Sequence, residues 1–161
     1  MSIKILDSLE VSLYVNCYKS IESKIQWSEF PNGKQTGLQY IKGTDPWHGA
    51  VGRMNLTDDW QSDVVINEYF KNTVFEEVIK KYQLTRTRLM WLKPFSCYSM
   101  HQDDAPRLHI PLITNPDCYF VFRDTGLSYL EAGKVYWVDT TQSHSAMNCS
   151  KEWRLHLLGS F

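Results

Sequence analysis

The chain has 161 residues, of which 43% are apolar and 22% are charged, and its formal net charge at pH 7 is −1. This length favours one domain that can bury a substantial core, and the composition is that of a soluble globular protein. A nearly neutral chain without a long apolar run gives no reason to expect nucleic acid or a membrane as a partner.

Four cysteines are spread along the chain, at Cys17, Cys97, Cys118 and Cys149. No two of them have the C-x-x-C spacing of zinc ribbons and thioredoxin-like motifs. The first residues meet a charge at Lys4, before any apolar stretch typical of a signal peptide. We therefore expect a cytoplasmic protein whose cysteines are free thiols in the core.

The N-terminal half contains few clear elements. Residues 3–18 fit either a strand or a helix, and we expect them to pack on the outside of the main sheet. Residues 27–60 are rich in turn signals, so they form either a lid or pocket rim, or irregular surface loops with two short strands. Residues 64–82 carry an apolar stripe at helical spacing, which predicts a helix capped by Thr57 or Ser62.

From Thr85 to the end, short strand-like runs alternate with turn signals, and no further helix is expected. The predicted strands span residues 86–92, 98–101, 107–113, 118–122, 128–130, 135–138, 144–149 and 153–158. Roughly eight short strands at this spacing indicate a β-sandwich or barrel.

A short motif, His101-Gln102-Asp103, could hold a metal. On a strand, His101 and Asp103 point to the same face, so an imidazole nitrogen and a carboxylate oxygen converge. Such a pair supplies two of the three ligands of the two-His, one-carboxylate triad of non-haem Fe(II). His144, which opens a late strand, is the best candidate for the third ligand. The alternative is a strand-end His101 beside a solvated Asp103, with His144 at the surface.

Two strands carry cations that suit an anionic ligand. Arg154 stands among apolar neighbours, where a buried guanidinium needs a partner such as the carboxylate of a dicarboxylate cosubstrate. The alternative is an edge-strand arginine that reaches solvent. Arg107 and His109 share one face of their strand and could contact a carboxylate of the cosubstrate or substrate. For Arg107 the alternative is an ion pair with one of the neighbouring aspartates, Asp103, Asp104 or Asp117.

The motifs also occur in a fixed order. They are Leu89-x-x-Leu92-Lys93-Pro94, His101-x-Asp103, Arg107-x-His109-x-Pro111-Leu112, Gly133-x-x-Tyr136-Trp137-x-Asp139 and His144-x-x-x-Asn148-x-Ser150-x-x-x-Arg154-x-His156-Leu157. Together they resemble the Fe(II)/2-oxoglutarate-dependent oxygenases over about residues 85–158. Within that superfamily the chain resembles the aspartyl/asparaginyl β-hydroxylase-like branch, which includes free-proline hydroxylases.

This resemblance implies a mainly β fold, a double-stranded β-helix or jelly roll with flanking helices. Residues 85–161 would form its catalytic core, and residues 1–84 would support and rim it within one oxygenase domain. The implied metal ligands are His101, Asp103 and His144, with no further catalytic residue. The implied contacts to 2-oxoglutarate are Arg154 on its distal carboxylate, a hydroxyl from Ser96, and Arg107 and His109 on a carboxylate of either 2-oxoglutarate or the substrate.

The implied activity uses Fe(II), 2-oxoglutarate and O₂ to hydroxylate a free amino acid or a peptidyl Asp, Asn or Pro side chain, and it releases succinate and CO₂. Aspartyl/asparaginyl β-hydroxylases proper lack the carboxylate ligand, whereas Asp103 is present here, so small amino-acid hydroxylases are the closer analogue. Two alternatives are a cupin-like metalloenzyme that does not use 2-oxoglutarate and a non-catalytic jelly-roll module that binds a small molecule.

Overall fold

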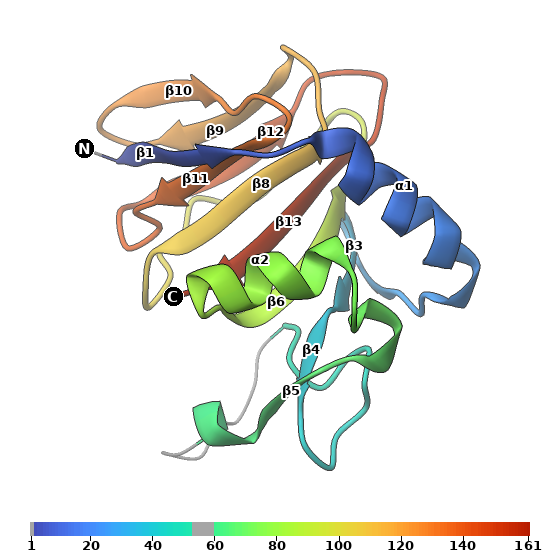
Figure 1. Ribbon diagram of the computed structural model, residues 1–161. Coiled ribbons are helices and arrows are strands. Elements are labelled where there is room, and N and C mark those ends of the chain that lie inside the picture. Colours follow the sequence, from blue (N-terminus) through green and yellow to red (C-terminus); the bar gives the residue numbers. More distant parts are fainter. Residues whose placement is uncertain (1, 53–59) are drawn as a thin grey trace.

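The computed structural model describes residues 2–52 and 60–161, and its regular structure is mostly antiparallel β-sheet (Figure 1). The largest sheet has seven strands in the spatial order β1 (Ile3–Ser8), β11 (Lys134–Val138), β8 (Arg107–Ile113), β13 (Arg154–Ser160), β6 (Thr85–Leu92), β3 (Gly33–Gly37) and β2 (Ser28–Phe30). A second sheet has four strands in the order β10 (Gly126–Tyr129), β9 (Cys118–Phe122), β12 (His144–Asn148) and β7 (Ser96–Cys97). Strands β4 (Gln39–Ile41) and β5 (Val64–Ile66) pair separately.

From β6 onward the chain alternates between the two large sheets, except that β9 and β10 form a hairpin within the smaller one. Strands β6, β8, β11 and β13 belong to the seven-stranded sheet, and β7, β9, β10 and β12 belong to the four-stranded sheet. The sheets face each other, since the ring of Phe120 in β9 lies 5.2 Å from that of His109 in β8. This is a jelly-roll arrangement of antiparallel strands, so the predicted mainly β fold with flanking helices is confirmed.

Two α-helices, α1 (Val11–Ile21) and α2 (Val74–Tyr82), cover the outer face of the seven-stranded sheet (Figure 1). The main core lies between these helices and the sheet, and it includes the fully buried side chains of Phe70, Phe75, Leu89, Leu108 and Leu157. Each such side chain contributes roughly 1.5–3 kcal/mol through burial of apolar surface. The helices therefore stabilise the sheet from outside and leave its inner face free for other contacts.

Most predicted strands are present, and those at 107–113 and 118–122 have the predicted bounds. The strand predicted at residues 98–101 is wrong. The strand nearest to it is β7, which ends at Cys97, and His101 forms only an isolated bridge. The reason is topological: the chain must leave the four-stranded sheet after β7 to enter β8 in the other sheet.

The helix predicted over residues 64–82 is wrong in its first half. That half contains β5 and a single 3₁₀ turn, η3 (Glu68–Phe70), before α2 begins at Val74. Asn72 adopts a left-handed φ of 58°, and the Thr73 side chain accepts a hydrogen bond from the Phe75 amide, so the helix starts there. Of the predicted caps, Ser62 lies in another 3₁₀ turn, η2 (Trp60–Asp63), and Thr57 lies outside the described residues.

Two other N-terminal segments each contain more than one kind of element. Residues 3–18 contain both alternatives, because β1 joins the edge of the large sheet and α1 packs outside it, followed by the 3₁₀ turn η1 (Glu22–Lys24). Residues 27–60 include the short strands β2, β3 and β4, and β3 pairs directly with β6. None of the described residues in 27–60 lines the cavity described below.

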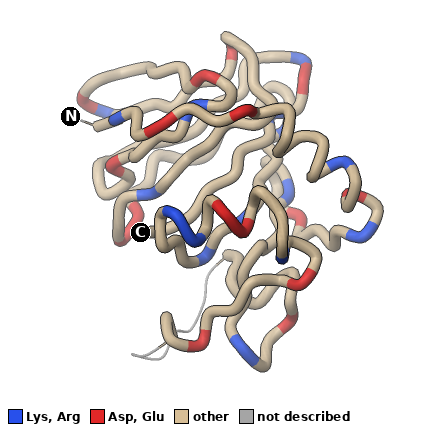
Figure 2. Tube along the Cα trace, in the orientation of Figure 1, with Lys and Arg blue, Asp and Glu red and all other residues tan. Residues whose placement is uncertain are grey.

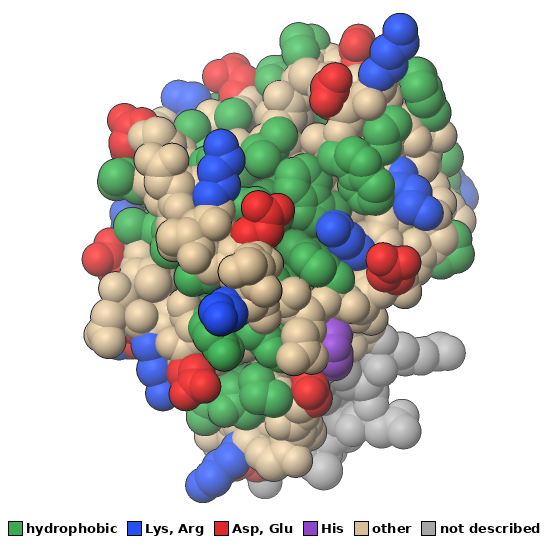
Figure 3. Space-filling view, turned by 90° about the vertical axis from the view of Figure 1, so that its right-hand side faces the viewer, with side chains coloured by type: hydrophobic (Ala, Val, Ile, Leu, Met, Phe, Trp, Pro, Cys, Tyr) green, Lys and Arg blue, Asp and Glu red, His purple; other side chains and the backbone are tan. Residues whose placement is uncertain are grey.

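All four cysteines are free, but the expectation of core thiols is correct only for the buried Cys118. Cys97 and Cys149 are exposed, and Cys17 is half-buried against the edge of the main core. Acidic and basic residues are interspersed along the chain (Figure 2). On the face in Figure 3, apolar side chains lie at the surface between acidic and basic ones. No helix in the described part is long and apolar enough to span a bilayer.

Candidate active site

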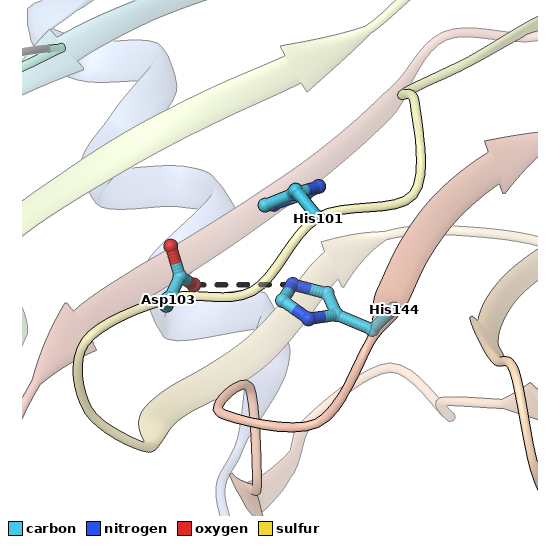
Figure 4. A group of neighbouring side chains, drawn as sticks. All are labelled: His101, Asp103 and His144. Atoms are coloured by element: carbon cyan, nitrogen blue, oxygen red, sulfur yellow. Dashed lines mark ion pairs between the residues drawn. The ribbon is translucent and has the colours of Figure 1, made fainter.

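Three side chains from two separate segments converge between the sheets (Figure 4). His101 and Asp103 come from the connection between β7 and β8, and His144 is the first residue of β12. One ligand atom from each lies within 4.8 Å of the others, and Asp103 Oδ2 is 3.8 Å from His144 Nε2. The structure thus brings together the three residues that the sequence suggests as metal ligands.

The backbone holds these residues without the strand that we expected at residues 98–101. The amides and carbonyls of His101 and His144 exchange two hydrogen bonds of 2.9 Å each. The Asp103 amide donates to the Thr140 carbonyl oxygen at 2.8 Å. Both segments are therefore fixed to each other, and His101 faces His144 through a one-residue bridge and not through strand alternation.

Backbone carbonyls also orient the two imidazoles. His101 Nδ1 lies 2.8 Å from the Ser99 carbonyl oxygen, and His144 Nδ1 lies 2.9 Å from that of Gln142. Each ring then donates its Nδ1 proton to a carbonyl and leaves the Nε2 lone pair free, which is the tautomer a metal ligand requires. Burial lowers the pKa of His144 below its usual 6.5, so this imidazole is neutral at neutral pH.

Asp103 is kept ionised by its neighbour. Arg107 Nε donates to Asp103 Oδ2 at 2.9 Å, and Arg107 Nη1 donates to Ser160 Oγ at 2.8 Å. Burial alone would raise the pKa of Asp103, but the hydrogen bond and charge of Arg107 outweigh it and the net shift is downward. The ion pair considered for Arg107 is therefore formed, and it presents a charged carboxylate beside the two imidazoles.

The three side chains lie at the wall of a cavity of about 110 Å³ between the two sheets. This is room for several water molecules. The lining also includes three arginines and several apolar or aromatic side chains, among them Arg88, Arg107, Arg154, Met90, Tyr98 and Phe120. A cationic interior of this kind favours small anions.

Arg154 does not reach solvent, so the edge-strand alternative is wrong. Its side chain lies inside the sandwich at 5% exposure, and among the described residues its Nε has no hydrogen-bond partner. Its Nη2 donates to His156 Nδ1 at 3.2 Å. Burial lowers the pKa of Arg154 to about 10, which leaves the group charged at neutral pH. A buried guanidinium with unused donors fits a bound carboxylate.

The remaining candidates separate into two groups. His109 lines the cavity, and its buried Nδ1 has no partner in the described part of the chain. Ser96 is not brought to the cavity, since it lies on β7 and its hydroxyl donates to the Lys93 carbonyl oxygen at 2.8 Å.

Arg88, a buried cavity-lining arginine on β6, is not among the residues that the sequence suggested. The available signal was strand alternation, which places it on the same face as Met90.

Residues 67–161 match the family model described as aspartyl/asparaginyl beta-hydroxylase. The match spans more than half of the chain, so the chain belongs to the aspartyl/asparaginyl β-hydroxylase family. A search of the curated proteins finds no match.

Solved structures with the same fold include three oxygenases. An oxidoreductase of the 2OG-Fe(II) oxygenase family from Burkholderia pseudomallei aligns with a TM-score of 0.61 at 11% identity, over 99% of this chain and 83% of that one. A Pseudomonas putida prolyl-4-hydroxylase gives 0.56 at 12% identity, over 99% and 91%. A viral collagen prolyl hydroxylase from Paramecium Bursaria Chlorella virus-1, in complex with 2OG, gives 0.51 at 11% identity, over 100% and 97%.

Family membership makes this chain an Fe(II)- and 2-oxoglutarate-dependent dioxygenase, and Fe(II), 2-oxoglutarate and O₂ are the cofactor and cosubstrates of this class. The residues present fit such a centre. Two imidazole nitrogens and one carboxylate oxygen at one side of a cavity are the donor set of the two-His, one-carboxylate iron sites. Membership in this family favours an oxygenase over both a different cupin-like metalloenzyme and a non-catalytic binding module.

Proposed function

We propose that this dioxygenase hydroxylates a free amino acid, or an Asp, Asn or Pro side chain of a peptide, and that it releases succinate and CO₂. The observation that carries the proposal is the convergence of His101, Asp103 and His144 within 4.8 Å at the wall of a cationic cavity. The proposal takes residues 1–161 as one oxygenase domain, because β1, β2 and β3 pair into the same sheet as the C-terminal strands.

In this proposal His101, Asp103 and His144 would hold Fe(II), and the cavity that they line would receive 2-oxoglutarate and O₂. Bound iron, together with these two cosubstrates, supplies the oxidation of a C–H bond. The protein orients the ligands: the carbonyls of Ser99 and Gln142 fix the two imidazoles.

Arg107 fixes the Asp103 carboxylate through its Nε donor. Loss of such supporting hydrogen bonds commonly costs roughly 10–100-fold in metal affinity or activity.

Arg154 is the proposed partner of the distal carboxylate of 2-oxoglutarate. Its buried position strengthens a charge-assisted pair, and its Nε donor is unused within the described part of the chain. Arg107 and His109 line the same cavity and are proposed to contact a carboxylate of 2-oxoglutarate or the substrate.

The carboxylate ligand bears on the substrate. Because Asp103 is present, the chain is closer to the small amino-acid hydroxylases than to the aspartyl/asparaginyl β-hydroxylases proper. Prolyl hydroxylases are among the proteins with the same fold, so proline belongs in any substrate panel.

The test is a screen of free amino acids and matched short peptides with the purified protein, Fe(II) and 2-oxoglutarate under air. We expect at least one compound to stimulate succinate release and to gain one oxygen atom by mass spectrometry. Asp103→Ala, checked for folding by circular dichroism, is the control that should abolish both signals. Absence of any 2-oxoglutarate turnover in the folded wild-type protein with Fe(II) would contradict the proposal.

A further inference from the structure

Arg88 is a second buried cation in the cavity, separate from the proposed 2-oxoglutarate contact. It lies in the middle of β6, opposite Leu158 of β13, and His109 of β8 lies on the far side of Leu158 in the same row. Its side chain is 9% exposed and lines the cavity. Its Nε and Nη1 are fully buried, and neither has a hydrogen-bond partner among residues 2–52 and 60–161.

A guanidinium in this position is costly to keep without an anion. Removing an unpaired charge from water is unfavourable, and each buried donor without an acceptor adds to that cost. Burial and the charges of Arg107 and Arg86 lower the pKa of Arg88 to about 9, so it remains charged at neutral pH. The described residues place no carboxylate within ion-pair distance of it.

The carboxylates of 2-oxoglutarate are already assigned in the proposed function. In that proposal its distal carboxylate would contact Arg154, and its keto-acid end would lie toward the metal ligands. No third carboxylate is left for Arg88. Arg88 and Arg154 are also far apart on the sheet. Arg88 of β6 is opposite Leu158 of β13, which is four residues along β13 from Arg154. Four residues of a strand span roughly 13 Å.

Arg88 lies toward the metal-ligand end of the cavity. Arg107, the partner of Asp103, is paired in register with Ser160 and donates to its side chain. Leu158, opposite Arg88, is two residues from Ser160 along β13, whereas Arg154 is six residues away. An anion on Arg88 is therefore close to the convergent triad, while an anion on Arg154 is at the other end.

We propose that Arg88 binds a carboxylate of the molecule that is hydroxylated, so that the substrate is a small carboxylic acid such as a free amino acid. This inference rests on the proposed function. The carboxylate would be held by Arg88 Nε and Nη1, and Tyr98 and Met90 beside it line the same wall. The carbon to be oxidised would then be a few bonds from the anchored carboxylate, facing His101 and Asp103. An internal Asn or Pro residue of a peptide has no free carboxylate to offer, and an internal Asp residue has only that of its side chain.

The experiment compares the twenty free amino acids with their C-terminal amides in the 2-oxoglutarate-saturated protein with Mn(II) in place of iron. Binding is read as a shift in unfolding temperature, and succinate release is read separately with Fe(II). We expect the free acid of the true substrate to bind at least about 100-fold more tightly than its amide, because the amide leaves buried donors facing an uncharged group.

Arg88→Met keeps the length of the side chain and removes its charge, and Arg154→Met is the matched variant. We expect Arg88→Met to lose amino-acid binding by a similar factor with 2-oxoglutarate affinity unchanged, and Arg88→Lys to restore part of it. Arg154→Met should show the reverse pattern. Folding of each variant is checked by circular dichroism.

Three outcomes would overturn the assignment. These are equal binding of acid and amide, failure of every free amino acid to bind the wild-type protein, and loss of 2-oxoglutarate binding in Arg88→Met with amino-acid binding intact. Failure of the proposed function itself looks different: the wild-type protein would then neither bind 2-oxoglutarate nor release succinate with Fe(II). The two proposals are therefore tested by separate readouts.

Discussion

The same strands of the seven-stranded sheet carry apolar side chains toward the helices and cationic or imidazole side chains toward the space between the two sheets. The outward group is fully buried and comprises Leu89, Leu108, Ile110, Leu155 and Leu157. The inward group is also buried but contains unused polar atoms, and it comprises Arg88, His109, Arg154 and His156. Strand alternation allows one sheet to stabilise the fold on one side and to hold costly polar groups on the other.

This difference separates stability from chemistry. Side chains against α1 and α2 contribute free energy of unfolding through apolar burial. Side chains in the cavity lower that free energy and are available to ligands. Substitutions on the outer face should therefore lower the free energy of unfolding, whereas substitutions on the inner face should mainly change ligand binding.

The largest effect is expected for Asp103→Ala. It removes the charged member of the convergent triad, so 2-oxoglutarate turnover with Fe(II) should fall by more than the roughly 10–100-fold seen when only supporting residues are lost. The fold should persist because the Asp103 side chain contacts Arg107 and not the apolar core. Succinate release and circular dichroism check this, and full activity in the variant would remove Asp103 from the metal site.

Leu157→Ala tests the outer face. Leu157 is 0% exposed and packs in the core beneath the helices, so its truncation should cost about 3 kcal/mol of unfolding free energy through lost burial and a cavity. Urea denaturation measures the loss. The KM for 2-oxoglutarate in the folded fraction should stay unchanged, and a large KM increase would show that the two faces are coupled.

Arg154→Met tests the inner face of the sheet. Its main effect should be on the binding of 2-oxoglutarate. A lost charge-assisted pair is worth about 1.5–3 kcal/mol, so the 2-oxoglutarate requirement should rise by roughly 10–100-fold with metal affinity unchanged. The free energy of unfolding should stay equal or increase, because a buried charge is removed. Steady-state kinetics and denaturation measure both, and an unchanged cosubstrate dependence would count against the role of Arg154.

The sequence was sufficient where the determinants are local. Alternating apolar residues and turn signals predicted the strands at 107–113 and 118–122 with their bounds, and the H-x-D motif with His144 predicted the convergent triad. It failed for the helix at 64–82, because the left-handed φ of Asn72 interrupts an otherwise continuous apolar stripe.

Arg88 could not be predicted because alternation gives the two faces of a strand without saying which one meets a cavity. Only the pairing of β6 with β13 and the facing four-stranded sheet place Arg88 in the interior. The strand expected at residues 98–101 is absent for a related reason, since the crossing between sheets overrides local strand propensity.

A smaller effect is expected from pH, again on the inner face. His156 Nδ1 accepts a hydrogen bond from Arg154 Nη2, so protonation would place a second donor against the guanidinium. Burial, and then the charge of Arg154, hold the pKa of His156 well below 6.5 in the folded state. Below about pH 6.5 the unfolded chain binds a proton that the folded chain does not, so stability should fall as pH decreases, by up to about 1.4 kcal/mol per pH unit. Denaturation at several pH values should show a weaker dependence in His156→Gln, whereas identical profiles would mean that His156 does not contribute.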